Sequence, residues 1–251
     1  MHVRDGVRLG LMALLGMVVT SGSAWADRRY YGDTYQVAQA PTDEVELEYW
    51  FDYDLPELTR SALPSTVHQI EIETGLADNW DLAGYQVFEG GAGALTWAGM
   101  KLESRVRLAD PGEWPVNAQL YLEYSHDVEP GNAGVLEGKV ILDRNDGALN
   151  LAANLIVEKQ LSTSEHLELG WDLGASYELS PKLRVGAEYI GRMEKGNVGE
   201  GQLGTDFESS HRLAPTVSVA MGKLWWVLAP TFRLGDHGDA FTLRTVMGIT
   251  L

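Results

Sequence analysis

Two short runs of the sequence combine a hydroxyl group with an imidazole and could in principle support nucleophilic catalysis. They are Ser125-His126-Asp127 and Ser209-Ser210-His211. A catalytic triad depends on geometry, and neighbouring residues of an extended strand point to opposite faces. Both runs also fall where a strand is predicted to meet a loop. We therefore expect no enzyme and no catalytic residue, and a surface hydrolase acting on a lipid or an ester is the distant alternative.

The other polar clusters lack the spacing of a metal or phosphate site. His68, His166 and His237 are isolated, so a zinc site is not expected. The acidic run at residues 236–239 could bind calcium, but no calcium-loop pattern surrounds it. The glycines at 90–93 are not followed by the helix that a phosphate cradle needs. We expect no metal and no cofactor.

The composition excludes several classes of protein. The chain has 251 residues, 28 glycines, no cysteine and a formal net charge of −17. Without cysteine there can be neither a disulfide scaffold nor a thiolate metal site. The acidic charge disfavours a nucleic-acid partner, because nucleic acids attract basic surfaces. No apolar run reaches the roughly 18 residues that a membrane-spanning helix requires.

The first 26 residues have the three parts of a secretory signal peptide. Arg4 and Arg8 give a positive start, and residues 9–19 form an apolar core. Residues 23–26 (Ser-Ala-Trp-Ala) then place small side chains at the −3 and −1 positions before Asp27. We predict a signal peptide over residues 1–26, cleavage after Ala26, and export of the remaining chain.

The body of the chain alternates between apolar and polar residues with a period of two. Along residues 167–179, Leu, Leu, Trp, Leu, Ala, Tyr and Leu fall on one face, and Glu, Gly, Asp, Gly, Ser and Glu fall on the other. A strand separates these residues into two faces, whereas a helix would scatter them. The pattern predicts about twelve strands, near residues 44–53, 66–76, 80–89, 96–108, 115–125, 135–144, 148–158, 165–179, 182–192, 211–221, 224–233 and 240–251.

Tight turns and longer polar loops alternate between these strands, as in a bacterial outer-membrane barrel. We predict an all-β fold: one closed, antiparallel, up-and-down transmembrane β-barrel over residues 44–251, preceded by a polar N-terminal segment over residues 27–43. Strands of about ten residues fit a tilted bilayer crossing. A secreted β-sandwich or a lipocalin-like barrel, with its apolar face turned inward, is the alternative.

Several strand and turn motifs resemble those of a poorly characterised family of porin-like outer-membrane barrels of Gram-negative bacteria, related to phenol-degradation and transporter-type barrels. The motifs are GLADNWDL at 75–82, KLESRVRL at 101–108, PGEWPVNAQLYLEY at 111–124, GKVILDRNDGALNLAANL at 138–155, and the last strand with Arg244 and Gly248. The resemblance implies the barrel fold and a location in the cell outer membrane. It implies no catalytic residue.

The inward faces of such a barrel would carry charged residues that line a pore. The predicted pore-lining residues are Glu46, Glu48, Glu71, Glu73, Lys101, Glu103, Arg105, Arg107, Glu123, Lys139, Glu168, Asp172, Arg184, Glu188 and Arg244. Acids outnumber bases, which favours cations. We expect a narrow porin-like channel for an unidentified small solute, or alternatively a filled structural or partner-binding barrel. Expected partners are outer-membrane lipid, lipopolysaccharide and a periplasmic or membrane protein.

Overall fold

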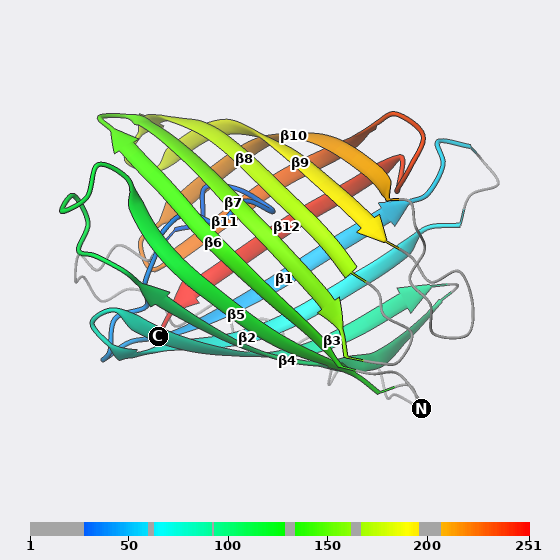
Figure 1. Cartoon of the computed structure of the whole chain (residues 1–251), viewed down its shortest axis with the longest axis horizontal. Helices are drawn as coiled ribbons and strands as arrows, with labels where there is room; N and C mark the ends of the chain where they lie inside the picture. Colours follow the sequence, from blue (N-terminus) through cyan, green and yellow to red (C-terminus); the bar gives the residue numbers. More distant parts are fainter. Residues whose placement is uncertain (1–27, 60–62, 92, 129–133, 162–166, 196–206) are drawn as a thin grey trace, which may run out of the picture.

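The computed structural model describes residues 28–59, 63–91, 93–128, 134–161, 167–195 and 207–251, so the predicted signal peptide and His166 lie outside the described residues. Twelve strands form one closed barrel in which each strand pairs antiparallel with its neighbours in the chain and β1 pairs with β12 (Figure 1). The strands are β1 (Val45–Leu55), β2 (Ser65–Ala77), β3 (Trp80–Gly91), β4 (Ala94–Arg107), β5 (Asn117–Asp127), β6 (Val135–Asp146), β7 (Leu149–Gln160), β8 (Leu167–Ser180), β9 (Leu183–Lys195), β10 (Glu208–Met221), β11 (Leu224–Leu234) and β12 (Phe241–Thr250). The predicted fold class is confirmed. Among the described residues, no helix is long and apolar enough to cross a membrane.

The outside of the barrel is apolar and the inside is mainly polar. In β8, Leu173 and Tyr177 are 49% and 53% exposed, whereas Asp172 is 1% exposed. This distribution is the reverse of that in a soluble protein, and it suits a wall whose outer face contacts hydrocarbon. Closure pairs the strand edges, which a bilayer demands because it offers no water to unpaired backbone groups. The soluble sandwich and lipocalin alternatives, which need the apolar face inside, are therefore wrong.

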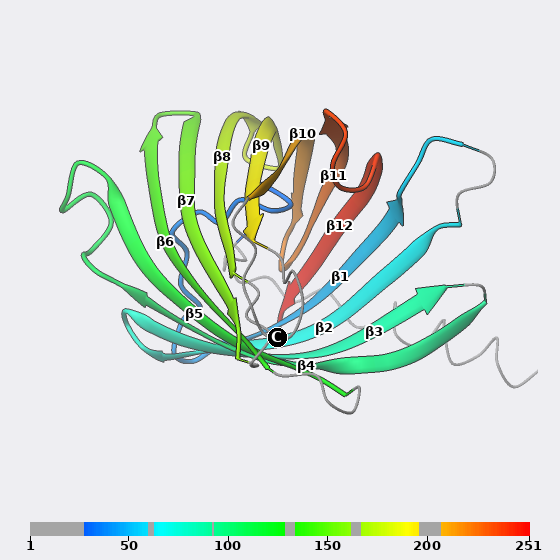
Figure 2. The ribbon, with the colours of Figure 1, turned by 45° about the vertical axis from the view of Figure 1, so that its right-hand side comes forward.

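The two ends of the barrel differ in their connections. At one end, called the turn end here, β6–β7, β8–β9 and β10–β11 are joined by tight turns. Gly147 and Gly222 adopt φ angles of +59° and +68° in two of these turns, a region that favours glycine. The opposite end, called the loop end, carries the connections that follow β1, β5, β7, β9 and β11 (Figure 2). In outer-membrane barrels the short turns lie on the periplasmic side.

One seam of the wall has an interruption in its hydrogen-bond ladder. In the β10–β11 pair, Leu213 lies opposite Phe232 and Val217 lies opposite Leu228, with no paired residues between them. The same register places Pro215 opposite Pro230. Proline has no N–H to donate, so neither residue can donate a ladder bond to the other. Both hydrogen bonds of this residue pair are therefore missing from the β10–β11 ladder.

Residues 28–43, called the N-terminal segment here, lie inside the barrel rather than beside it. Figures 1 and 2 show this stretch in dark blue, surrounded by the strands. Tyr31 and Thr34 are fully buried, and Tyr35 is 8% exposed. A segment that the sequence describes only as polar and without periodicity therefore occupies the lumen.

Candidate functional site

The N-terminal segment enters and leaves the lumen at the turn end. A guanidinium nitrogen of Arg28 donates to the carbonyl oxygen of Pro181, in the β8–β9 turn, at 3.4 Å. Near the other end of the segment, Gly75 N of β2 donates to the carbonyl oxygen of Pro41 at 3.3 Å. The two limbs are joined by the Gln36 amide, which donates to the carbonyl of Arg28 at 2.8 Å. The segment is therefore a hook whose tip points into the barrel.

The tip of the hook is held by one carboxylate of the wall. The backbone N–H groups of Gly32, Asp33 and Thr34 all donate to Glu188 of β9, at 2.7, 2.9 and 2.6 Å. Hydrogen bonds to a charged acceptor are stronger than those between neutral groups. A Cβ at Gly32 would lie 2.6 Å from the Cβ of Ala229, so the tip also needs glycine for its close approach to β11.

A second ionic contact holds the tip from another strand. Asp33 forms a salt bridge with Arg244 of β12, which also binds Asp52 of β1 through two hydrogen bonds of 2.7 Å. Burial disfavours a charge on Asp33. The nearby guanidinium of Arg244, supported by Arg212, Arg192 and Lys139, outweighs that effect and holds the pKa of Asp33 below its ordinary value.

Uncharged side chains of the wall bind the backbone of the hook in the manner of a neighbouring strand. Asn154 accepts from Tyr35 N at 2.7 Å and donates to the carbonyl of Tyr35 at 2.9 Å. Gln119 donates to the carbonyl of Ala38 at 2.7 Å, and Ser218 donates to the carbonyl of Arg29 at 2.6 Å. These bonds satisfy backbone groups that burial would otherwise leave unpaired. The polar wall is thus fitted to this peptide.

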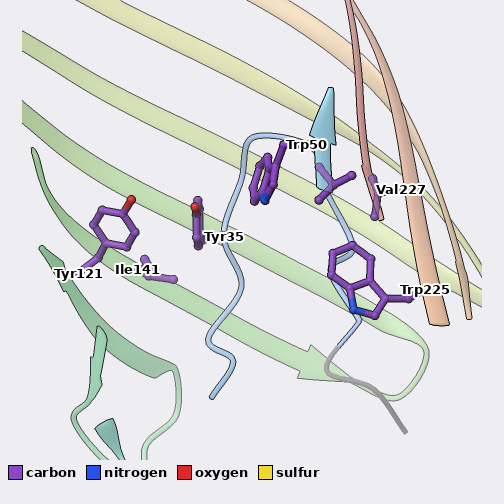
Figure 3. Close-up of a cluster of buried hydrophobic side chains, with 7 residues drawn as sticks. Tyr35, Trp50, Tyr121, Ile141, Trp225 and Val227 are labelled. Carbon is purple, nitrogen blue, oxygen red and sulfur yellow. The ribbon is translucent and has the colours of Figure 1, made fainter. Parts of the chain in front are cut away.

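The middle of the lumen also contains an apolar cluster that the sequence analysis missed (Figure 3). Its members are Tyr35, Trp50, Tyr121, Ile141, Trp225, Val227 and Val246, with Val37 packed against them. The available signal was a local break in alternation, because Trp225 and Trp226 are adjacent and must face opposite sides. Packing around Tyr35 adds apolar contact to the hydrogen bonds that hold the hook.

The hook separates two cavities of the lumen. The cavity at the turn end has a volume of about 600 Å³ and is bordered by Arg28, Tyr30 and Val37 of the hook. The cavity on the loop-end side has a volume of about 300 Å³ and is bordered by Asp33 and Tyr35. A solute that crosses the barrel must therefore pass the hook or displace it.

A row of glutamates crosses the inner wall from strand to strand and is interrupted at Ala83 of β3. Cross-strand neighbours in the register run from β1 to β10 as Glu46, Glu73, Ala83, Glu103, Glu123, Glu137, Glu158, Glu168, Glu194 and Glu208. Every strand from β1 to β10 except β3 thus contributes a glutamate. Directly opposite Cα atoms in antiparallel strands are roughly 4.5–5.5 Å apart, and like charges placed opposite each other are destabilising. Fold stability alone does not account for such a row.

Basic side chains beside the row offset part of its charge. Lys101 lies 3.2 Å from Glu123, and Lys139 lies 2.8 Å from Glu137. Arg192 lies 3.1 Å from Glu168. Arg105 contacts Glu103 at 3.2 Å, Asp81 at 3.0 Å, and Glu73. The acids of the row outnumber these bases.

The predicted pore-lining residues lie on the inward face of their strands. Ten of them are buried: Glu46, Glu48, Glu71, Glu73, Glu103, Arg105, Glu123, Asp172, Arg184 and Glu188. The half-buried ones are Lys101, Arg107, Lys139, Glu168 and Arg244. Glu188 and Arg244 contact the hook, and Arg184 pairs with Glu178 at 3.2 Å near the turn end. That these residues line a conducting path remains a prediction.

The histidines that suggested catalysis contact aromatic residues on the outer face. His211 is hydrogen-bonded to the hydroxyl of Tyr189 at 2.9 Å, and His126 stacks on Tyr124. His68 is likewise hydrogen-bonded to the hydroxyl of Tyr49 at 2.6 Å. Across the part of the chain that the structure describes, no group of three His, Cys, Asp or Glu residues could hold a metal ion.

Comparisons with solved structures identify the fold. The chain is similar to an outer membrane channel from Pseudomonas putida F1, with a TM-score of 0.63 and 11% identity, over 88% of this chain and 99% of that one. It is also similar to the NanC porin (TM-score 0.57, 8% identity, 82% and 100% covered) and the KdgM porin (TM-score 0.54, 9% identity, 81% and 98% covered). No family model and no curated protein match the sequence. The chain has the fold of porin-like outer-membrane β-barrels.

Proposed function

We propose that this outer-membrane barrel is a narrow channel for small solutes, and that its own N-terminal segment restricts the lumen. The observation that carries the proposal is the hook, which stands between two cavities of the lumen and contacts several strands of the wall. Small-solute transport also agrees with the channels and porins that share the fold. The proposal includes no catalytic step, and the solute remains unidentified.

The channel should prefer cations over anions, although weakly. The support is the glutamate row, in which acids exceed bases along the whole height of the wall. Rings and rows of carboxylates favour cation entry in pores. Because mobile ions screen charges over about 8 Å at physiological salt, the preference should weaken as the salt concentration rises.

Conductance in planar bilayers tests the proposal. We expect small, stable current steps from the barrel over residues 27–251, and larger steps from a variant that lacks residues 28–40. Heat-dependent gel mobility would show that both barrels are folded. If neither protein conducts, the channel function is wrong.

The alternative is a barrel that the hook keeps filled, with a structural or partner-binding role. The dense bonding of the hook to Glu188, Asn154 and Gln119 favours it. This reading expects current from the shortened variant only. The two functions are therefore separated by the current of the complete barrel.

A further inference from the structure

The side chain of Arg29 is buried inside the barrel beside the rings of Tyr35 and Trp50, a site called the Arg29 seat here. It is 8% exposed, and its guanidinium carbon lies 4.0 Å from the ring centroid of Tyr35 and 4.4 Å from that of Trp50. Figure 3 shows these two rings along the course of the hook, Tyr35 on the hook itself and Trp50 on β1. A flat cation over an aromatic face is attracted by the negative charge of the ring face, and the attraction is stronger where water is excluded.

The carboxyl groups of Glu48 and Glu71 lie near the Arg29 guanidinium and attract it electrostatically, without a direct ion-pair contact among the described residues. Glu48 of β1 and Glu71 of β2 lie directly opposite each other and are 4% and 2% exposed. Glu71 accepts a hydrogen bond from Trp50 Nε1 at 2.9 Å, which fixes one wall of the seat. Two buried carboxyl groups placed opposite each other on adjacent strands are stabilised by a cation near them.

Several polar atoms of the seat have no hydrogen-bond partner among the described residues. They are Oε2 of Glu48 and Nε and Nη2 of Arg29. A space of about 20 Å³, bordered by Arg29, Tyr35 and Glu48, lies beside them. The arrangement therefore offers a cation acceptor, two aromatic faces and room for one small group, yet Arg29 does not use all of its donors there.

The seat adjoins the loop-end cavity through its two aromatic rings. Tyr35 and Trp50, which form its aromatic faces, also border that cavity. A solute that enters from the loop end therefore meets Tyr35 and Trp50 in the same cavity as the tip of the hook. The direction of approach suits a ligand that arrives through the lumen.

We propose that the seat is a binding site for a soluble organic cation of the guanidinium or alkylammonium class, and that Arg29 fills it as a tethered competitor. The inference rests on the channel function proposed above, because the ligand must arrive through the lumen. A tethered group acts at a millimolar or higher effective concentration. Free cations that bind only weakly are therefore kept out while Arg29 is seated.

Calorimetric titration of the folded, detergent-solubilised barrel with ethylguanidinium chloride tests this site, with sodium chloride as the reference titrant. We expect Arg29→Ala to bind ethylguanidinium about tenfold more tightly than the unaltered protein, because the competitor is gone. Arg29→Lys keeps a tethered charge and should bind at an intermediate level. Lys182→Ala removes a positive charge from an exposed turn and should bind like the unaltered protein.

A second substitution identifies the acceptor. Glu48→Gln in the Arg29→Ala background should lower the affinity for ethylguanidinium at least fivefold, because it removes the negative charge beside the seat. Equal affinity in the unaltered and Arg29→Ala proteins, or no effect of Glu48→Gln, would overturn the inference. Binding without current in any variant would instead remove the channel function and leave the site intact.

Discussion

Glu188 has the most concentrated set of contacts with the hook, because its carboxylate receives three consecutive backbone N–H groups. Hydrogen bonds to a charged group each contribute roughly 1.5–3 kcal/mol. The polar interior is therefore more than a solvated lining, since individual side chains recognise a particular peptide within the same chain.

Glu188→Ala should release the tip of the hook. We expect a larger single-channel conductance and faster protease cleavage within residues 28–43, because three N–H groups lose their acceptor. Glu113→Ala, which removes a carboxylate from an exposed turn, serves as the control and should leave both measurements unchanged. An unaltered conductance in a folded Glu188→Ala barrel would show that the tip does not restrict the current.

The salt bridge between Asp33 and Arg244 predicts a dependence on acid pH. Because the pKa of Asp33 is held below its ordinary value, about 3.9 in model peptides, the ionised form stabilises the seated hook at neutral pH. That contribution is lost as the pH falls through the lowered pKa. We expect conductance to rise below about pH 4 in the unaltered barrel. Asp33→Asn should have the higher conductance already at pH 7, with a weaker rise from pH 5 to 3.

Alternation of residue types is sufficient to place side chains inside or outside the barrel, which is why the charged inward positions could be predicted. It gives no information about Arg29, Asp33 or Asn154 as partners in the lumen. The residue types of the hook show no periodicity, and its contacts with Glu188 and Asn154 join residues more than a hundred positions apart in the chain. Only the closed structure brings these residues together.

The strands extend farther toward the loop end than their sequence pattern suggests. The pattern predicts strands at 182–192 and 211–221, whereas β9 reaches Lys195 and β10 begins at Glu208. Beyond the bilayer the outer face no longer has to be apolar, so the alternation ends while the hydrogen-bond ladder continues. Strand number is therefore easier to predict than strand length.

The paired prolines of β10 and β11 predict a stability effect that depends on both strands. A residue pair in the hydrogen-bonded position of an antiparallel ladder exchanges two N–H···O bonds, and Pro215 opposite Pro230 can make neither. Replacing both prolines with valine should raise the thermal midpoint of the gel-mobility shift, since each restored bond contributes about 1 kcal/mol. The double variant should gain both bonds, and each single variant one. No gain in the double variant would mean that strand geometry, and not the missing donors, sets the interruption.

The glutamate row belongs to the whole barrel, because it exists only through the register of ten successive strands. The row cannot be predicted from the sequence of any single strand, since each glutamate is one inward residue among several. Strand stagger is fixed by closure of the cylinder, which sequence periodicity does not encode. The excess of acids over bases could be predicted from the sequence, whereas their alignment could not.

Neutralising the centre of the row should change ion selectivity. We expect the triple substitution Glu123→Gln, Glu137→Gln and Glu158→Gln to move the reversal potential in a tenfold salt gradient toward zero or toward anion selectivity. The pore size should stay nearly constant, because glutamine has almost the same volume as glutamate. Anion selectivity in the unaltered barrel would contradict the cation preference.

The hook also constrains the order of events when the protein is made. Its bonds reach Asn154 on β7, Glu188 on β9 and Ser218 on β10, strands that follow it late in the chain. Until those strands have been synthesised and assembled, residues 28–43 have no surface to bind. The N-terminal segment therefore cannot take its final position before the late strands have assembled. Either the barrel closes around the segment, or the segment enters afterwards through the periplasmic opening.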